Sequence, residues 1–202
     1  MRESDISLKK SILRKSIRTK LAAMSPNERT EESEAICSHL SNELLARRPL
    51  TILSFAAMPI EPMLLSLIDP FLKQGHRMAF PRVVDVKSGE MHLHEVTDID
   101  SLVVNAMGIP EPAPGVHPTV LPEEIDVALV PAWAFDPATG ARLGKGGGFY
   151  DRLLAGDSWR AETIGIAFRY QLVDQVPEDA HDQRVQRIVT AEGMIELDQS
   201  SD

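Results

Sequence analysis

The clearest chemical signal in this sequence is a glycine-rich segment, residues 142–151, which reads RLGKGGGFYD. Its four glycines let the backbone approach a ligand closely and turn amide N–H groups toward it. The segment follows an apolar strand and precedes a predicted helix, whose first turn adds a partial positive charge. Arg142 and Lys145 supply full positive charges. Together these features predict a loop that binds phosphate.

The segment departs from the two common phosphate-binding fingerprints. A P-loop has four residues between its first glycine and Gly-Lys, but only three separate Gly140 from Gly144, and Gly146 stands where Ser or Thr is needed. The dinucleotide pattern G-x-G-x-x-G fails at Phe149, which occupies the position of the third glycine. A glycine-rich turn without a ligand is therefore an alternative interpretation.

Asp151 ends the segment with a negative charge. A carboxylate beside a phosphate site needs a cation, and Mg²⁺ held by one or two carboxylates together with phosphate oxygens would supply it. The alternative is that Asp151 caps the following helix or pairs with Arg152.

A second group of cations lies near the N-terminus. Residues 1–20 hold seven Lys and Arg against two acidic residues, or 7 − 2 = +5. The whole chain has a formal charge of 21 − 30 = −9, so the other 182 residues carry −14. A targeting peptide, a basic stripe for an anionic ligand and a solvated helix face each explain such a reversal. The absence of a small-residue cleavage site argues against the targeting peptide.

The spacing in residues 5–23 predicts an amphipathic helix. Four-residue steps place three apolar residues on one face: Leu13, Ile17 and Leu21. A parallel row of cations lies beside them: Lys10, Arg14 and Arg18.

Several segments resemble the 5-formyltetrahydrofolate cyclo-ligase family. RLGKGGGFYD resembles the family's signature, and so does the longer block LVPAWAFDPATGARLGKGGGFYDRLL. KSILR at Lys10–Arg14 is similar to the family's N-terminal segment that contacts ATP, and Glu61 in AAMPIEP matches a folate-binding glutamate. FPRV, IPEP and TIGIAFRYQLVDQVPEDAHDQRVQRIVT extend the likeness, in the expected order, over nearly the full chain.

The resemblance implies conversion of 5-formyltetrahydrofolate and ATP to 5,10-methenyltetrahydrofolate, ADP and phosphate, with Mg²⁺. In that reaction the formyl oxygen attacks the γ-phosphate, a folate amine closes the ring on the imidate phosphate, and phosphate leaves. Such chemistry needs positioning and charge neutralisation more than a protein nucleophile.

The resemblance also implies roles for individual residues. The expected catalytic residues are Arg142, Lys145 and Tyr150. The expected ATP-binding residues are Lys10, Arg14, Arg142, Leu143, Gly144, Lys145, Gly146, Gly147, Gly148, Phe149 and Tyr150. The expected folate-binding residues are Phe55, Met58, Glu61, Phe149 and Tyr150. The expected metal ligands are Asp151 and Asp182. Arg18 lies outside the motif and is interpreted as solvated surface.

Two other functions use the same residues. An ATP-dependent phosphotransferase for another small molecule would keep the phosphate site and give Glu61 no role toward folate. A non-catalytic protein that binds folate or nucleotide would show binding without turnover.

The elements that position these residues alternate between helix and strand. Ser25-Pro26-Asn27-Glu28 resembles a capping box, which predicts a second helix to about Arg48. A helical segment is expected at Pro62–Gly75, a hairpin at Val83–Val86 and Met91–Val96, and an irregular segment at 105–124. Further strands are expected at Thr51–Ala57, Arg77–Phe80, Asp126–Phe135, Thr163–Phe168 and Arg187–Thr190. This order predicts one three-layer α/β/α domain over residues 1–202, Rossmann-like, with a mostly parallel sheet.

Composition bounds the remaining possibilities. Apolar residues make up 43% of the chain, which argues for a packed core and against disorder. The single cysteine, Cys37, excludes a disulfide framework and is interpreted as a packing residue. The net negative charge disfavours nucleic acid as a partner, and no run approaches the length of a membrane span. We therefore expect a cytoplasmic monomer that acts on small molecules.

Overall fold

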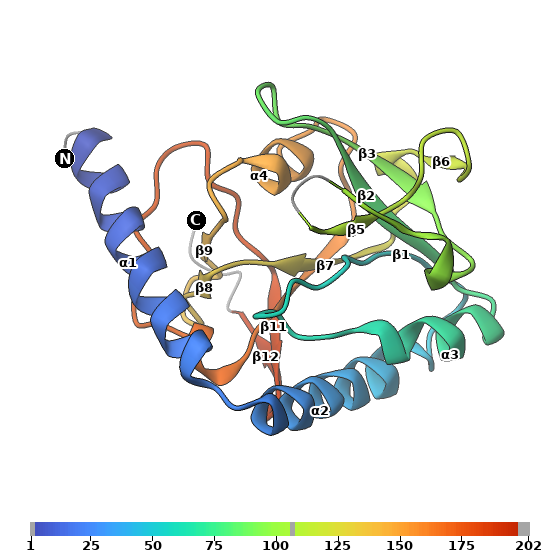
Figure 1. The fold of residues 1–202 in the computed structure, drawn as a ribbon, viewed down its shortest axis with the longest axis horizontal. Coiled ribbons are helices and arrows are strands. Elements are labelled where there is room, and N and C mark those ends of the chain that lie inside the picture. Colours follow the sequence, from blue (N-terminus) through green and yellow to red (C-terminus); the bar gives the residue numbers. More distant parts are fainter. Residues whose placement is uncertain (1–2, 106–107, 198–202) are drawn as a thin grey trace.

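The fold is built on one eight-stranded sheet, seen in a computed structural model that describes residues 3–105 and 108–197. The strand order is β12-β11-β10-β7-β1-β2-β3-β6. The five central strands, β11 to β2 in that order, run parallel, and β12, β3 and β6 pair antiparallel at the edges. This arrangement confirms an α/β fold with a mostly parallel sheet (Figure 1).

The bounds of the elements are as follows. The helices are α1 (Glu3–Ala23), α2 (Pro26–Leu44), α3 (Ile68–Lys73) and α4 (Phe149–Leu154). The strands of the main sheet are β1 (Thr51–Leu53), β2 (Arg77–Asp85), β3 (Glu90–Glu95), β6 (Thr119–Val120), β7 (Val127–Pro131), β10 (Glu162–Ile166), β11 (Arg187–Thr190) and β12 (Gly193–Glu196). Two small pairs lie outside it: β4 (Val103–Val104) with β5 (Pro110–Glu111), and β8 (Ala134–Phe135) with β9 (Arg142–Leu143).

Alternate residues of the central strands enter two hydrophobic clusters, one on each face of the sheet. Ile52 and Leu129 lie in the cluster that α1, α2 and α3 complete, with Ile17, Leu40 and Phe71 buried in it. Leu53, Ala128 and Val130 lie in the other, against which Tyr150 and Leu153 of α4 pack. Among the described residues, α1, α2 and α3 therefore cover one face, whereas the short α4 packs on the other (Figure 1).

Local sequence signals explain the two longest helices. The buried Ile17 and Leu21 give α1 its apolar face. The capping box that begins α2 is confirmed, because Ser25 Oγ accepts a hydrogen bond from the Glu28 amide and the Glu28 carboxylate accepts one from the Ser25 amide. Cys37 on α2 is buried and burial raises the pKa of its thiol, in agreement with a packing role.

Several expected boundaries are wrong. The strand expected at Thr51–Ala57 ends at Leu53, and the second helix ends at Leu44 rather than Arg48. The segment Pro62–Gly75 forms only a 3-10 turn and the short α3. The strand expected at Asp126–Phe135 divides, because the backbone of Trp133 turns to bond with Leu143 and starts the β8–β9 hairpin. The expected strands at Arg77–Phe80 and Val83–Val86 are one strand, β2.

In the described part of the chain, no helix combines the length and the apolar character that crossing a membrane requires.

Candidate active site

The glycine-rich loop, residues 144–148, connects the β8–β9 hairpin to α4. The hairpin follows β7, a fully buried central strand, so the loop lies beyond the carboxyl end of a parallel strand, where α/β folds place their ligands. Gly146 and Gly148 have φ angles of 105° and 65°, a backbone region that favours glycine. Because α4 has only six residues, its partial charge is small, and full charges must supply most of the attraction for an anion.

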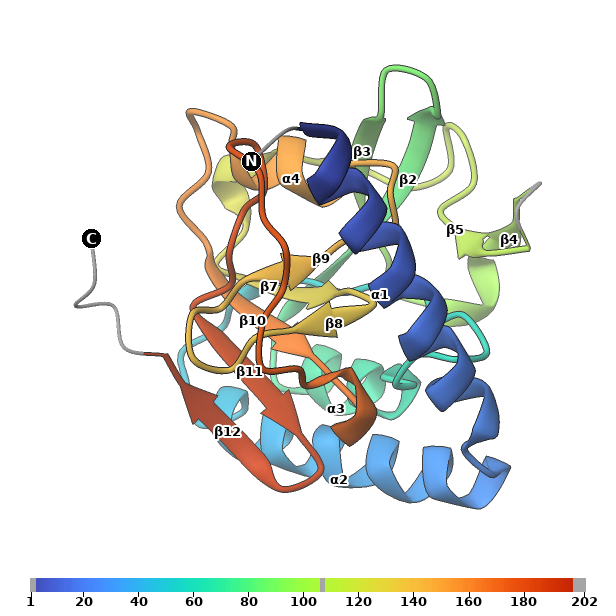
Figure 2. The ribbon, with the colours of Figure 1, turned by 90° about the vertical axis from the view of Figure 1, so that its left-hand side faces the viewer.

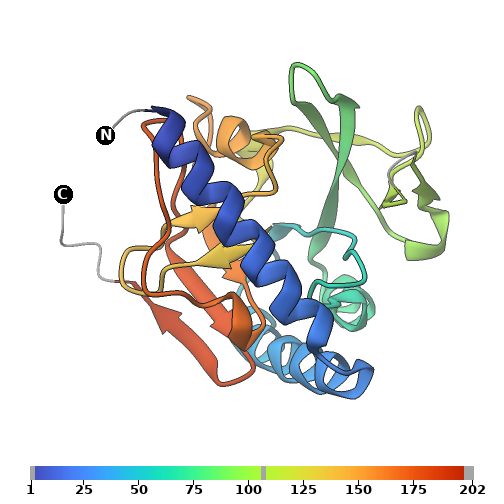
Figure 3. The same cartoon turned by 60° about the vertical axis from the view of Figure 1, so that its left-hand side comes forward.

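A cavity of about 750 Å³ opens beside this loop, and we call it the loop cavity. Its walls come from three separate parts of the chain: α1, the loop with α4, and the segment 179–183 before β11. Figures 2 and 3 show α1 lying across the β8–β9 hairpin and along this segment. The charged residues of its lining are Lys10, Arg14, Asp151, Arg152, Asp179 and Asp182.

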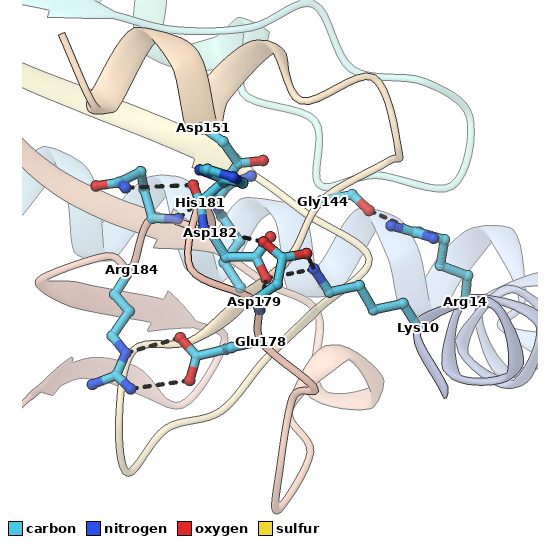
Figure 4. A network of polar contacts seen from close by, with 11 residues as sticks. Lys10, Arg14, Gly144, Asp151, Glu178, Asp179, His181, Asp182 and Arg184 are labelled. Carbon is cyan, nitrogen blue, oxygen red and sulfur yellow. Dashed lines mark hydrogen bonds and ion pairs between the residues drawn. The ribbon is translucent and has the colours of Figure 1, made fainter. Parts of the chain in front are cut away.

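Lys10 lies between two carboxylates in the loop cavity. Its Nζ is 2.8 Å from Asp179 Oδ2 and 2.5 Å from Asp182 Oδ2 (Figure 4). Burial lowers the pKa of Lys10, but these two hydrogen bonds and charges outweigh it, so the pKa lies above its ordinary value. The hydrogen bond from Lys10 is also the main reason that the pKa of Asp179 is lowered. The ammonium is thus held in its charged form at the cavity wall.

Arg14 lies one turn beyond Lys10 on the same side of α1. Its Nε donates a 2.9 Å hydrogen bond to the Gly144 carbonyl, and the side chain lines the loop cavity (Figure 4). Arg18, one further turn along, is exposed, as the sequence predicts for a solvated cation. The basic row of α1 therefore divides into two residues at the cavity and one in solvent.

Arg142 and Asp151 form an ion pair at the wall of the loop cavity, in which Arg142 is buried and Asp151 lines the cavity. The Arg142 side chain is 2% exposed, and its terminal nitrogen lies 2.5 Å from Asp151 Oδ1. Asp151 Oδ1 also accepts a hydrogen bond of 3.1 Å from the Gln183 amide. Burial lowers the pKa of Arg142, and the charge of Asp151 opposes this shift. The suggested pairing of Asp151 with Arg152 is wrong, because its ionic partner is Arg142, which does not line the cavity.

Lys145 does not line the loop cavity and instead pairs with Glu61. Glu61 is buried, and its Oε2 accepts a 2.8 Å hydrogen bond from the Met58 amide. Around this pair, Leu21, Ile60, Trp133 and Gln171 surround a space too small for a water molecule. We call Met58, Glu61, Trp133 and Lys145 the Glu61 region. The structure therefore separates Lys145 from Lys10 and Arg14, with which the sequence groups it.

The aromatic candidates occupy different environments. The charges of both Arg142 and Glu61 influence the pKa of Tyr150. Its buried hydroxyl has no hydrogen-bond partner among the described residues. Burial is the largest cause of its raised pKa, Glu61 adds to the shift, and Arg142 opposes it. Phe149 is half-buried, with the Arg152 guanidinium 5.9 Å from its ring centre. Phe55 and Leu143 are buried in the hydrophobic core.

The site also contains residues to which the sequence analysis assigned no role. Asp179 shares Lys10 with Asp182, and the Asp179 amide donates to Asp182 Oδ2 at 2.7 Å. Gln183 and Arg152 also line the cavity. The available signal was the acidic pair three residues apart around His181, opposite in charge to the first helix.

Asp151 and Asp182 have the chemistry of a site that shares Mg²⁺ with a ligand. Both carboxylates line the loop cavity. Asp151 Oδ2 accepts no hydrogen bond from the described residues, so one carboxylate oxygen is available. Within residues 3–105 and 108–197, no three His, Cys, Asp or Glu side chains gather as a complete metal site. Mg²⁺ commonly takes one or two carboxylates and completes its shell with water and phosphate oxygens.

Comparison with known proteins gives a consistent result. Residues 6–191 match the model of the 5-formyltetrahydrofolate cyclo-ligase family. A 5-formyltetrahydrofolate cyclo-ligase of Mycolicibacterium smegmatis is 32% identical over 165 residues, 80% of this chain and 83% of that protein. The Escherichia coli protein of the same name is 28% identical over 179 residues, 86% and 96% of the two chains.

Solved structures agree with these sequence relatives. The structure of Aquifex aeolicus 5,10-methenyltetrahydrofolate synthetase superposes with a TM-score of 0.76 at 31% identity, covering 96% of this chain and 95% of the other. A 5,10-methenyltetrahydrofolate synthetase from Mycoplasma pneumoniae superposes with a TM-score of 0.74 at 26% identity, covering 90% and 98%.

Proposed function

The chain belongs to the 5-formyltetrahydrofolate cyclo-ligase family, and from this membership we propose how its two charged regions divide the substrates. It is an ATP-dependent ligase that converts 5-formyltetrahydrofolate to 5,10-methenyltetrahydrofolate. In our proposal the loop cavity receives the triphosphate of ATP, and the Glu61 region receives the folate. The loop between them brings the formyl oxygen and the γ-phosphate together.

The observation that carries this proposal is the combination of charges and unused amides in the loop cavity. Lys10 and Arg14 reach it from α1. Gly146 and Gly148 also line it, and among the described residues their amide N–H groups donate no hydrogen bond. Free amides beside two fixed cations suit the oxygens of a polyphosphate. ATP oxygens would then replace Asp179 and Asp182 as partners of Lys10.

The proposed chemistry begins by making the formyl oxygen a better leaving group. That oxygen attacks the γ-phosphate, ADP departs, and an imidate phosphate results. The neighbouring folate amine then bonds to the formyl carbon and gives up its proton, the C–O bond to phosphate breaks, and inorganic phosphate leaves with that proton as the ring closes. Arg142 acts in this scheme by holding Asp151 at the cavity wall, and Tyr150 is a neutral hydrogen-bond donor. Electrostatic positioning of this kind commonly dominates phosphoryl transfer.

Mg²⁺ forms part of the proposal. Asp151 and Asp182 would hold it from two sides of the loop cavity. When bound, it would neutralise charge on the phosphate oxygens. Arg142 and the Gln183 amide both donate to Asp151 Oδ1, which fixes the carboxylate and leaves its Oδ2 for the ion.

The folate side of the proposal depends on Glu61. A carboxylate accepts hydrogen bonds from the amino and ring N–H groups of a pterin. Glu61 already accepts one from the Met58 amide, so its orientation is fixed. Because the Glu61 region has no room for a ligand, folate binding requires Lys145 to leave Glu61. The freed ammonium would then be available to the transferring phosphoryl group. Phe149 and Tyr150 would contact the folate rings, while Phe55 supports the region from the core.

A direct test mixes the purified protein with 5-formyltetrahydrofolate and Mg·ATP and follows the near-ultraviolet absorbance of the methenyl product. We expect the signal to need ATP and to be lost when EDTA removes the divalent cation. Binding of either substrate without turnover would favour the non-catalytic alternative. ATP consumption that starts only with another small molecule would favour a different phosphotransferase.

Action on small molecules follows from the family, whereas the monomeric state, the cytoplasmic location and the absence of nucleic acid as a partner stay predictions. So does the single-domain organisation over residues 1–202. Size-exclusion chromatography with light scattering tests the monomer, which predicts the mass of one 22.3 kDa chain.

A further inference from the structure

Arg152 joins two segments that are far apart in the sequence. Its terminal nitrogen donates to the carbonyl of Gly147 in the glycine-rich loop. Its Nε donates to the carbonyl of Gly89 at 3.3 Å, in the turn between β2 and β3. The same guanidinium lies over the ring of Phe149. One side chain on α4 thus connects the loop to a hairpin that contributes nothing to the lining of the loop cavity.

The two glycines beside Arg152 provide the space for its guanidinium. A Cβ added at Gly89 would lie 1.4 Å from a terminal nitrogen of Arg152, and one added at Gly148 would lie 2.8 Å from the other. Any larger residue at position 89 must therefore displace the guanidinium. The turn that carries Gly89 is fixed independently, because the Asp85 carboxylate accepts hydrogen bonds from the amides of Lys87 and Ser88.

Arg152 has a counterpart across the loop. Arg14 holds the Gly144 carbonyl, and Arg152 holds the Gly147 carbonyl. Together they hold the loop at two carbonyl oxygens, and in the described part of the chain the amides of residues 145–148 donate to no protein group. Arg14 is anchored in the 21-residue helix α1, whereas Arg152 belongs to the six-residue α4 and takes a second anchor from the hairpin.

We infer that Arg152 is a positioning residue for the phosphate-binding loop, and that the β2–β3 turn at Gly89 is its remote anchor. This inference rests on the proposed function, since it assumes that the loop receives ATP. The hairpin then affects the use of ATP without touching it. Loss of either contact lets the loop leave the conformation that receives the phosphates, and ATP binding must restore it.

The test uses two glycines with the same backbone angle. Gly89 and Gly115 both have φ of 70°, so alanine is equally strained at each. An added Cβ at Gly115 meets nothing within 4 Å, whereas at Gly89 it meets Arg152. We expect Gly89→Ala to raise KM for ATP about tenfold, while kcat and KM for folate change less than about twofold. Gly115→Ala should leave all three parameters near the wild type.

Arg152→Met and the double variant complete a cycle. Arg152→Met should raise KM for ATP as Gly89→Ala does, and the double variant should be no worse than either single one, because both changes remove one connection. Equal behaviour of Gly89→Ala and Gly115→Ala would overturn the inference, and so would additive effects in the double variant. Either result would leave the proposed ligase chemistry intact.

Backbone dynamics provide a second readout that needs no turnover. In the protein without ligand, the ¹⁵N order parameters of residues 144–148 should be lower in Arg152→Met and Gly89→Ala than in the wild type or Gly115→Ala. Unchanged order parameters would contradict the positioning role. If the wild type instead fails to turn over 5-formyltetrahydrofolate, the proposed function fails, while the order parameters still decide whether Arg152 holds the loop.

Discussion

Two lysines of this molecule pair with carboxylates in very different surroundings. Lys10 lies between Asp179 and Asp182 at the wall of a cavity of about 750 Å³. Lys145 pairs with the buried Glu61 where the surrounding side chains leave no room for water. Ligand oxygens can therefore replace the carboxylates around Lys10 without moving the backbone, whereas any ligand of Glu61 must first displace Lys145. In our proposal, the phosphate site is therefore preformed, whereas the folate site has to open.

The ion pair between Arg142 and Asp151, at the wall of the loop cavity, gives the largest expected effect. Asp151→Ala leaves the buried Arg142 charge without its partner, and breaking such a pair costs about 3–5 kcal/mol of unfolding free energy. For a chain of this size we expect the melting temperature to fall by about 10 °C. Thermal unfolding followed by circular dichroism measures this. Asp157→Ala, at an exposed aspartate just after α4, is the matched control.

A second variant separates charge burial from loss of a ligand. Asp151→Ala with Arg142→Met removes both charges, so it should recover part of the stability but none of the activity. If the single variant melts like the Asp157→Ala control, the pair is not the stabilising feature that its burial indicates.

At the loop cavity, Lys10→Met should weaken the use of ATP. Losing one charge-assisted contact should raise KM for ATP roughly 10- to 50-fold, with KM for folate nearly unchanged. Steady-state kinetics with each substrate varied in turn measures this. Arg18→Met is the control, because Arg18 lies two turns along the same helix and is exposed. Equal effects of the two changes would show that general positive charge on α1 matters, rather than the position of Lys10.

In the Glu61 region, Glu61→Gln should affect folate use rather than ATP use. It keeps the size of the side chain but removes the charge, so KM for folate should rise roughly tenfold while KM for ATP stays near the wild type. Lys10→Met serves as the cross-control in the same assay. Unchanged folate affinity in Glu61→Gln would exclude Glu61 as a folate ligand and remove the basis for assigning the two sides to different substrates.

The sequence located the loop and the residues of α1 because their signals are local. Glycine clustering marks residues 144–148, and a four-residue step brings Lys10 and Arg14 to one side of a helix. The sequence did not predict contacts between residues that are distant in the chain. The partners of Lys10 are 169 and 172 residues away, and no local pattern predicts that they pair with it.

The same limit explains the misplaced side chains. Arg142 and Lys145 are three residues apart, yet one is buried behind the cavity and the other faces Glu61, because the backbone turns at the glycines between and after them. Arg152 is adjacent to Asp151 in the sequence, but neighbouring positions on a helix do not face each other, so a residue from β9 becomes the ionic partner. Phe55, expected to bind folate, lies two residues beyond the end of β1 and is buried in the hydrophobic core.

Tyr150, whose pKa is influenced by both Arg142 and Glu61, gives the smallest expected change in stability. Its hydroxyl is buried without a hydrogen-bond partner among the described residues, so Tyr150→Phe should leave the melting temperature the same or slightly higher. If the phenol donates a hydrogen bond during the reaction, kcat should fall about tenfold.

Burial raises the pKa of Tyr150, so the phenol keeps its proton above pH 10. The ratio of wild-type to variant kcat should therefore stay constant from pH 7 to about pH 10. A wild-type loss of activity in this range that the phenylalanine variant lacks would show that the tyrosine ionises there, and that the region around Glu61 is open to solvent.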